Sequence, residues 1–147
     1  MKNLLFMVCF SVIVNAQEKL QVQQTIKNLF DGMRNADSLL VSNTFSDDAQ
    51  MFTLYKDEGG KVHRKMGNLK SFLQMIGTQT KGALDERIHS WKIHTDGFLA
   101  SVWTEYSFYF NGKKSHCGVN SFQLTKESGK WKVFYIVDTR RKHPCNN

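Results

Sequence analysis

Three short turn signals in the C-terminal half constrain the fold of this chain more than any other feature. Each glycine-containing pair interrupts a run rich in aromatic and β-branched residues: Asp96-Gly97, Asn111-Gly112 and Ser128-Gly129. Such pairs favour two-residue hairpin loops, because the central residues of these loops need positive φ. They predict a four-stranded antiparallel meander over residues 86–95, 98–110, 113–124 and 130–139.

Helical periodicity dominates the residues before the meander. One apolar stripe runs along a predicted helix over residues 18–34, formed by Val22, Ile26, Leu29, Phe30 and Met33. A short second helix is expected from Asp37 or Ser38 through Phe45.

A third helix is expected after Asn68, with Gly77 ending it. Between the second and third helices, residues 51–55 and 61–66 predict two strands around a Gly-Gly turn. The resulting order, α-α-β-β-α-β-β-β-β, indicates an α+β fold whose helices pack on one face of a curved sheet.

The first 16 residues are typical of a secretory signal peptide. Lys2 supplies a positive charge, residues 4–14 are apolar, and Val14-Asn15-Ala16 precedes a predicted cleavage site. Eleven apolar residues are too few to span a bilayer as a helix. We therefore expect residues 17–147 to form one exported domain, periplasmic or extracellular, after cleavage near Ala16. The alternative is that this segment is an apolar first helix of the fold.

Cleavage would also explain the odd number of cysteines. It would remove Cys9 and leave Cys117 and Cys145. Since an export route permits disulfides, we expect these two residues to form one intramolecular bridge.

Composition excludes several function classes. A chain of 147 residues with 41% hydrophobic residues is neither disordered nor fibrous. The 20 basic residues outnumber the 13 acidic ones, yet clusters such as those at 113–114 and 140–142 are short. A nucleic-acid partner is therefore not expected, and the charge is interpreted as solvated surface.

Motifs for metals and cofactors are missing from the sequence. The five histidines are dispersed, there is no C-x-x-C pair, and no phosphate-binding or dinucleotide-binding glycine motif occurs. We predict no metal, no cofactor and no stable membrane insertion.

Two-residue loops at the three turns would fix the register of the meander. They would pair Thr95 with Phe98, Phe110 with Lys113, and Glu127 with Lys130. Alternation along the strands then gathers one apolar set of side chains on the face toward the helices. That set contains a few polar residues as well: Arg87, His89, Tyr106 and Asp138. Polar groups in an apolar concavity are typical of a small-molecule pocket.

The opposite face would carry Trp103, Tyr109, Phe122 and Tyr135 among polar residues. So large an aromatic patch needs a cover, and a homodimer partner is the simplest one. The same register places His116 on this outer face, where we expect it to form hydrogen bonds at the dimer interface. A register slip of one residue would instead bring His116 to the ligand.

The pocket candidates allow two interpretations each. Tyr106 and Asp138 could form an acid–base pair, or Tyr106 could pack in the core while Asp138 pairs with Arg140 or Arg87. His89 could be a general base or a ligand contact, or simply a structural residue. Arg87 could bind a ligand carboxylate or phosphate, or form an ion pair with Asp138.

One stretch of the meander is similar to a known superfamily. The run 116–124 (HCGVNSFQL), with 129–132 (GKWK) and 138–141 (DTRR), resembles the nuclear-transport-factor-2-like superfamily, which includes SnoaL-like and ketosteroid-isomerase-like proteins. More narrowly, it resembles small exported proteins labelled lumazine-binding. The resemblance implies a cone whose curved sheet wraps one long helix, encloses a pocket and commonly forms dimers.

The resemblance implies a scaffold rather than a chemistry, because this fold hosts both enzymes and binding domains. The leading hypothesis is an exported protein that binds a small, partly apolar ligand, without established catalysis. The alternative is a cofactor-free enzyme of isomerase or dehydratase type that uses a pocket Asp or His base and a Tyr donor. A third possibility is a structural dimeric module whose pocket is closed.

Overall fold

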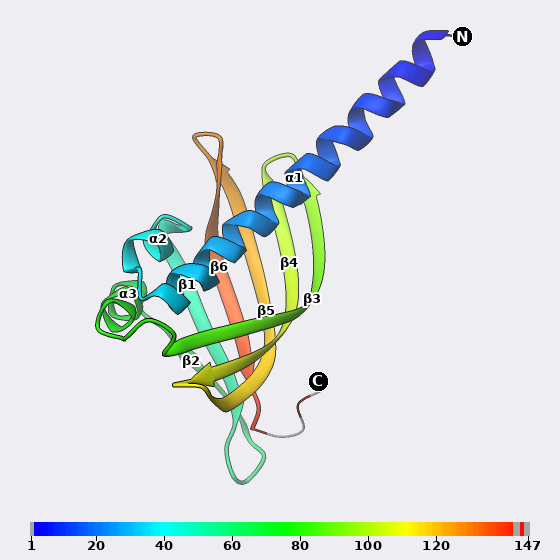
Figure 1. Cartoon of the computed structure of the whole chain (residues 1–147). Helices are drawn as coiled ribbons and strands as arrows, with labels where there is room; N and C mark the ends of the chain where they lie inside the picture. The colour runs from blue at the N-terminus through cyan, green and yellow to red at the C-terminus, as the bar shows by residue number, and fades with distance from the viewer. Residues whose placement is uncertain (1, 143–144, 146–147) are drawn as a thin grey trace.

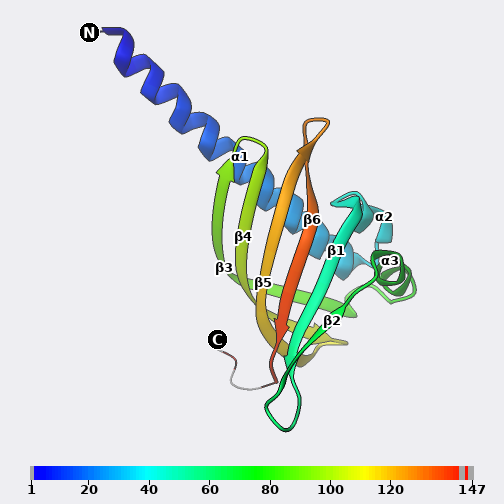
Figure 2. The same cartoon turned by 180° about the vertical axis from the view of Figure 1, so that it is seen from behind.

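The computed structural model describes the backbone of residues 2–142 and 145, and the side chains from Ala16 to the same end. Its elements follow the expected order: α1 (Lys2–Asn35), α2 (Ser38–Ser42), β1 (Phe45–Lys56), β2 (Val62–Met66), α3 (Leu69–Gly77), β3 (Leu84–Asp96), β4 (Leu99–Phe110), β5 (Lys113–Glu127) and β6 (Lys130–Arg140). The six strands form one curved, open sheet in the order β2-β1-β6-β5-β4-β3. The three helices lie on its concave side (Figures 1 and 2). The α+β cone predicted from the sequence is confirmed.

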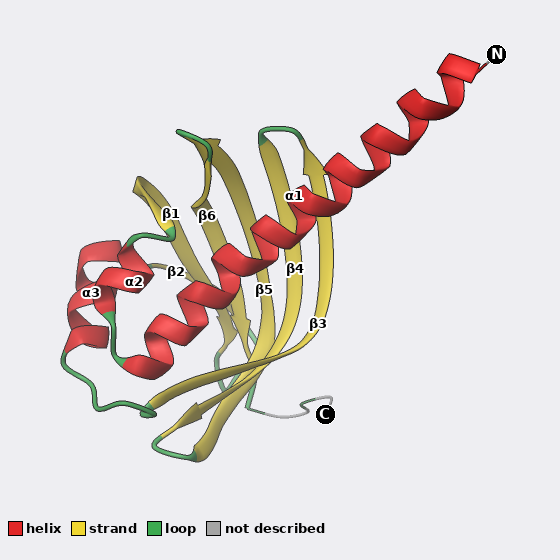
Figure 3. Ribbon diagram, turned by 45° about the horizontal axis from the view of Figure 1, so that its top comes forward, coloured by secondary structure: helices red, strands yellow, loops and turns green. Residues whose placement is uncertain are grey.

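Helix α1 supplies the centre of the core. The predicted stripe is buried along its whole length, from Val22 and Ile26, which are fully buried, to Met33. The C-terminal half of α1 crosses the concave face of the sheet, whereas its N-terminal half extends beyond the sheet (Figure 3). The first core residue of the described chain is therefore Val22.

The predicted helix caps are also present. The Asp37 side chain accepts a hydrogen bond from the Leu40 N–H, and the Asn68 side chain accepts one from the Ser71 N–H. However, α2 ends at Ser42 rather than at Phe45. Phe45 instead begins β1, where it pairs with Val133 of β6 and is buried. This long-range pairing overrides the local helical pattern.

Strand β1 makes the sheet mixed rather than wholly antiparallel. It pairs with β2 in antiparallel fashion and with β6 in parallel fashion, for example at Met51 opposite Ile136. The meander of β3 to β6 is antiparallel throughout, as predicted. The sequence predicted strands β1 and β2 but not the parallel pairing of β1 with β6.

Two of the three predicted hairpin registers are correct. Phe110 lies opposite Lys113, and Glu127 lies opposite Lys130. At the first turn, Thr95 pairs with Ala100 instead of Phe98. The loop is shifted by one residue, so that Gly97 is its first central residue with φ of 63°. This is the position at which a type II′ hairpin needs glycine.

Three irregularities in the meander change which residues share a face. The register shifts by one residue at His89 in β3, at Ser115 in β5 and at Phe134 in β6. Such β-bulges place two residues of one strand against one of its neighbour, so alternation is reversed beyond them.

The bulges correct several predicted positions. Phe122 and His116 lie on the concave face rather than on the outer one, with Phe122 fully buried. Cys117 lies on the outer face. The outer positions predicted for Trp103 and Tyr135 are confirmed by their pairing.

A disulfide joins Cys117 to Cys145, as predicted. It fastens the segment after β6 to the outer side of β5, next to the backbone pair formed by Cys117 and Arg141. Within the described part of the chain, no helix combines the length and apolar character needed to cross a membrane.

Candidate functional site

A cavity of about 290 Å³ lies between the helices and the concave face of the sheet. Apolar side chains line most of it, coming from α1, α3 and the strands: Leu29, Phe30, Met33, Phe45, Met51, Phe72, Met75, Leu84, Phe108 and Ile136. No side chain of the described residues fills this cavity. An apolar hollow of this kind suits a small molecule.

Polar side chains gather at one end of the cavity. They come from four adjacent strands: Glu86 from β3, Tyr106 from β4, His116 and Asn120 from β5, and Asp138 and Arg140 from β6. The alternation of these strands directs all six toward the concave side, once the bulges are counted. Tyr106, His116 and Asp138 were candidate site residues in the sequence analysis, and Arg140 was named there as a partner for Asp138.

Asp138 is the most strongly hydrogen-bonded group in this cluster. Its Oδ1 accepts a hydrogen bond of 2.6 Å from the Thr53 hydroxyl, and its Oδ2 forms an ion pair of 2.9 Å with Arg140 Nε. Tyr106 Oη lies 3.3 Å from the same Oδ2, and 3.0 Å from the Thr139 carbonyl oxygen. Asp138 is therefore tied to Arg140, which was one of the two predicted alternatives, and not to Arg87.

Tyr106 keeps its proton in this setting. Burial raises the pKa of its hydroxyl group, and the nearby carboxyl groups of Glu86 and Asp138 raise it further. The hydroxyl can donate to Thr139 or to Asp138, but at neutral pH it does not act as a base.

Like Asn120, Glu86 is a polar cavity residue that the sequence analysis did not identify. It lines the cavity and is partly buried, and its Oε1 accepts a hydrogen bond of 2.7 Å from Asn120 Nδ2. Removal from water raises the pKa of this carboxyl group to about 8; the hydrogen bond from Asn120 opposes the rise and the charge on Asp138 adds to it. Glu86 is therefore predominantly protonated at neutral pH.

A pattern in the sequence could have pointed to Glu86. It lies between Leu84 and Ile88 in an alternation that is otherwise apolar on one side. A register extrapolated back from the hairpin turn is wrong at Glu86, because the bulge at His89 reverses the alternation. Alternation counted from Leu84 would have placed it inside.

His116 lies at the boundary between the cavity and a second hollow. Its ring packs against the rings of Tyr106 and Phe108, with centroids 5.8 and 5.0 Å apart, and its Nδ1 lies 3.1 Å from Ser115 Oγ. Burial lowers the pKa of the imidazole, and the positive charge of Arg140 lowers it further. The His116 ring is therefore held in its neutral form.

The second hollow, of about 840 Å³, is more polar. It lies between the β1–β2 hairpin and the end of β6, and it shares His116 and Arg140 with the inner cavity. Lys56, Arg141 and Lys142 are among the residues that line it. The two hollows thus have His116 and Arg140 in common in their walls.

Arg87 and His89 do not line the cavity, contrary to the sequence prediction. The bulge at His89 turns Arg87 to the outer face, where its guanidinium group binds Asp85 at 2.8 Å and lies over the Tyr109 ring. His89 Nε2 lies 3.0 Å from Ser107 Oγ on the same outer side. Both residues therefore have structural partners instead of a place in the pocket.

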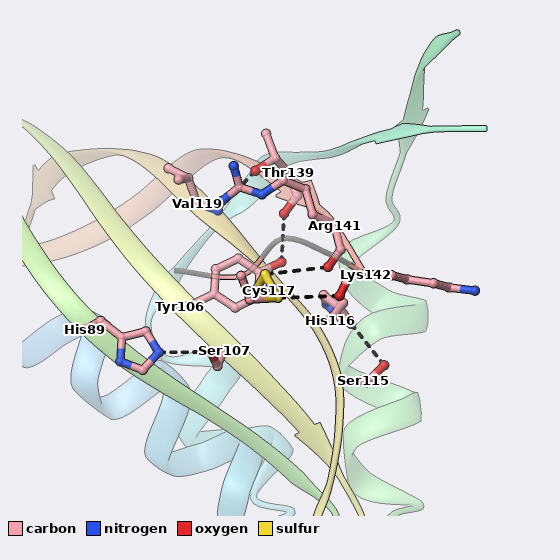
Figure 4. The surroundings of a disulfide bond; sticks show 11 residues. His89, Tyr106, Ser107, Ser115, His116, Cys117, Val119, Thr139, Arg141 and Lys142 are labelled. Atoms are coloured by element: carbon pink, nitrogen blue, oxygen red, sulfur yellow. Dashed lines mark hydrogen bonds between the residues drawn. A yellow bond between two sulfur atoms is a disulfide. The ribbon is translucent and has the colours of Figure 1, made fainter. Parts of the chain in front are cut away.

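The disulfide lies close to the polar end of the site. Cys117 directly follows His116 in β5, and Figure 4 shows the chain at Arg141 and Lys142 running past Cys117. Since Cys117 is only 3% exposed and bonded to Cys145, it offers no free thiol for catalysis. In the part of the chain that the structure describes, no three His, Cys, Asp or Glu side chains gather in a way that could hold a metal ion.

Comparison with known proteins identifies the fold. No protein-family model matches the sequence. No curated protein matches it either.

Solved structures, in contrast, are similar over nearly the whole chain. A nuclear-transport-factor-2-like protein of unknown function from Shewanella baltica matches with a TM-score of 0.64 and 20% identity, covering 88% of this chain and 96% of its own. A candidate scytalone dehydratase from Novosphingobium aromaticivorans matches with a TM-score of 0.69 and 14% identity, covering 92% of each chain.

A third structure, a nuclear-transport-factor-2-like protein with a cystatin-like fold from the same Novosphingobium species, matches with a TM-score of 0.66 and 10% identity. It covers 95% of this chain and 90% of its own. The chain therefore has the nuclear-transport-factor-2-like fold, as the resemblance in β5 and β6 implied. At these identities the likeness concerns the fold and not the chemistry.

Proposed function

We propose that this chain is an exported protein that binds a small, partly apolar molecule in the cavity beneath α1. The observation that carries the proposal is the cavity itself, about 290 Å³ of unfilled space with an apolar lining and one polar end. A purely structural module would fill this space with its own side chains, because unfilled core volume costs stability. Nothing in this proposal requires a cofactor.

Export is supported by the position along α1 at which the core begins. The predicted signal peptide ends at Ala16, before the first core residue, Val22, so cleavage would leave the described core complete. The Cys117–Cys145 bridge fits an oxidising compartment. The motif in β5 that resembles exported lumazine-binding proteins agrees with this location, and membership of that branch stays a prediction.

The ligand proposal is tested by filling the cavity. Met51 lines it from β1, whereas Met66 on β2 is 64% exposed and does not. Native mass spectrometry of the protein purified from its own host should show a bound small molecule. Met51→Trp should remove this molecule, and the matched control Met66→Trp should retain it. A wild-type protein that never carries a small molecule and binds none from an apolar probe library would contradict the proposal.

A homodimer is also proposed, through the outer face of the sheet. Trp103 is 45% exposed there, and the rings of Phe52 and Tyr135 contact each other on the same side. Light scattering should give twice the chain mass, and Trp103→Glu should reduce it to the monomer. A wild-type monomer at micromolar concentration would exclude this arrangement.

Acid–base catalysis by Asp138 and Tyr106 is the competing candidate function. The contact of 3.3 Å between them favours it. The hydrogen bonds that Asp138 accepts from Thr53 and Arg140 oppose it, because both carboxylate oxygens already have partners within the protein. The other predicted base, His89, is excluded from the cavity by its position on the outer face. If a turnover assay with a carbonyl compound detects isomerisation or dehydration, Asp138→Asn should abolish it.

A further inference from the structure

We propose that the cavity takes an uncharged, largely apolar molecule with one hydrogen-bond acceptor, and that the Glu86 carboxyl group donates a hydrogen bond to that acceptor. This inference rests on the proposed ligand-binding function and names the class of ligand. Glu86 is then the recognition residue of the site. The proposed recognition requires no chemical step.

The geometry of Glu86 leaves one oxygen available to a ligand. Asn120 Nδ2 donates to Oε1, so the amide fixes the plane of the carboxyl group. Asn120 is itself held by Thr104, 3.4 Å away, and is only 3% exposed. Within the described residues, Oε2 has no hydrogen-bond partner and is not fully buried, and Glu86 lines the cavity.

The surroundings favour the carboxylic acid over the carboxylate. The titratable groups around Glu86 are Tyr106 on β4, His116 on β5, and Asp138 with Arg140 on β6; α1 and α3 contribute only apolar side chains to the cavity. Burial and Asp138 both raise the pKa of Glu86, to about 8. Below that pH the group carries a proton, and since Oε1 already accepts from Asn120, Oε2 is the oxygen that can donate.

Charged ligands are poorly matched to the inner cavity. Arg140, which could attract an anion, already neutralises Asp138 through its Nε. An anion placed near Glu86 would meet the charge of Asp138, and the arginine that lines the cavity, Arg140, is already paired with that carboxylate. A cation would have to ionise Glu86 in an apolar setting, where separating charge from water is costly.

Four probes with the same bicyclic body separate these possibilities: methyl naphthyl ketone, ethylnaphthalene, naphthoate and naphthylmethylamine. Their dissociation constants are measured by fluorescence titration at pH 6.5. Because a hydrogen bond contributes about 0.5–1.5 kcal/mol, the ketone should bind about three- to tenfold more tightly than ethylnaphthalene. Both ions should bind more weakly than the ketone.

Three variants assign the effect to the side chain. In Glu86→Gln the amide still donates, so the ketone preference should persist and no longer depend on pH. In Glu86→Leu the preference should vanish, while ethylnaphthalene still binds. Glu105→Gln, on the exposed outer side of β4, is the matched control and should behave as the wild type. In the wild type, the preference should decline as the pH rises above about 8.

The possible results are distinguishable. Tightest binding of naphthoate or of naphthylmethylamine would overturn the inference, as would a ketone that binds no better than ethylnaphthalene. In each of these cases the ligand-binding proposal itself survives. Suppose that none of the four probes binds and that Met51→Trp does not change the small-molecule content of the purified protein. Then the proposed function fails, and the inference fails with it.

Discussion

Asn120 Nδ2 donates a hydrogen bond of 2.7 Å to Glu86 Oε1 across the concave face of the sheet. The two residues are not direct partners in the sheet, because β4 lies between β3 and β5. Their contact brings an amide and a protonated carboxyl group together at the polar end of an apolar cavity. This hydrogen bond therefore affects both the stability of the fold and the protonation of Glu86 in the site.

The free energy of unfolding should depend on pH through the protonation of Glu86. Because the folded-state pKa of about 8 lies above the ordinary value of 4.5, the folded protein binds more protons between these pH values, and stability is lost as the pH rises from about 4.5 through 8. The loss should reach about 2–4 kcal/mol, at about 1.4 kcal/mol per pKa unit and with allowance for the partial exposure of the group. Urea denaturation at pH 5, 7 and 9 measures it.

Glu86→Gln should flatten this profile, since an amide does not titrate. The control Glu105→Gln should keep the wild-type slope, because Glu105 lies on the exposed outer side of the sheet. An identical slope in wild type and Glu86→Gln would show that Glu86 is ionised in the folded protein.

His116 should titrate below its ordinary range. Burial and the charge of Arg140 lower its pKa, so the folded state prefers the neutral ring, and stability is lost as the pH falls through the ordinary histidine value of 6.5. Nuclear magnetic resonance titration of the imidazole protons measures the pKa directly. Arg140→Gln should raise it, because the repelling cation is removed while Asp138 remains. A pKa at or above 6.5 in the wild type would contradict the buried position of the ring.

Removing the disulfide should destabilise the protein. The bridge closes a loop with a sequence separation of 28, for which about 2–4 kcal/mol of stabilisation is expected. The double variant Cys117→Ser/Cys145→Ser should lose this amount in urea denaturation, and reductant should have no further effect on it. Wild-type protein treated with reductant should become equally labile. Equal stability with and without reductant would mean that the two thiols are not bridged.

Gly118 should not tolerate a side chain. A Cβ at this position would lie 1.7 Å from the Thr139 carbonyl oxygen and 3.0 Å from the Tyr106 ring, so the backbone of β6 would have to move. Gly118→Ala should therefore cost about 3 kcal/mol or more, at or above the upper end of the usual range for overpacked cores, or prevent folding. Gly59→Ala is the matched control, because its Cβ would meet only the Asp57 side chain at 3.4 Å. Thermal denaturation compares the two, and a Gly118→Ala protein as stable as the control would contradict the close approach of β6.

The sequence alone determined the elements of this protein and the order in which they follow. The apolar stripe from Val22 to Met33 specified α1, and glycine at each turn specified the hairpins of the meander. These are local signals, because positive φ at a turn and a helical period depend on residues close together in the chain. The bridge between Cys117 and Cys145 followed from counting cysteines after the predicted cleavage.

Only the tertiary structure decided which side chains meet in the cavity. Asp138 and Tyr106 were placed correctly, whereas Arg87, His89 and His116 were not. The physical reason is the bulge: one extra residue at His89 or Ser115 reverses every position beyond it, and nothing in the local alternation marks where it falls. Which residues make up the site therefore follows only from the observed register of β3 to β6.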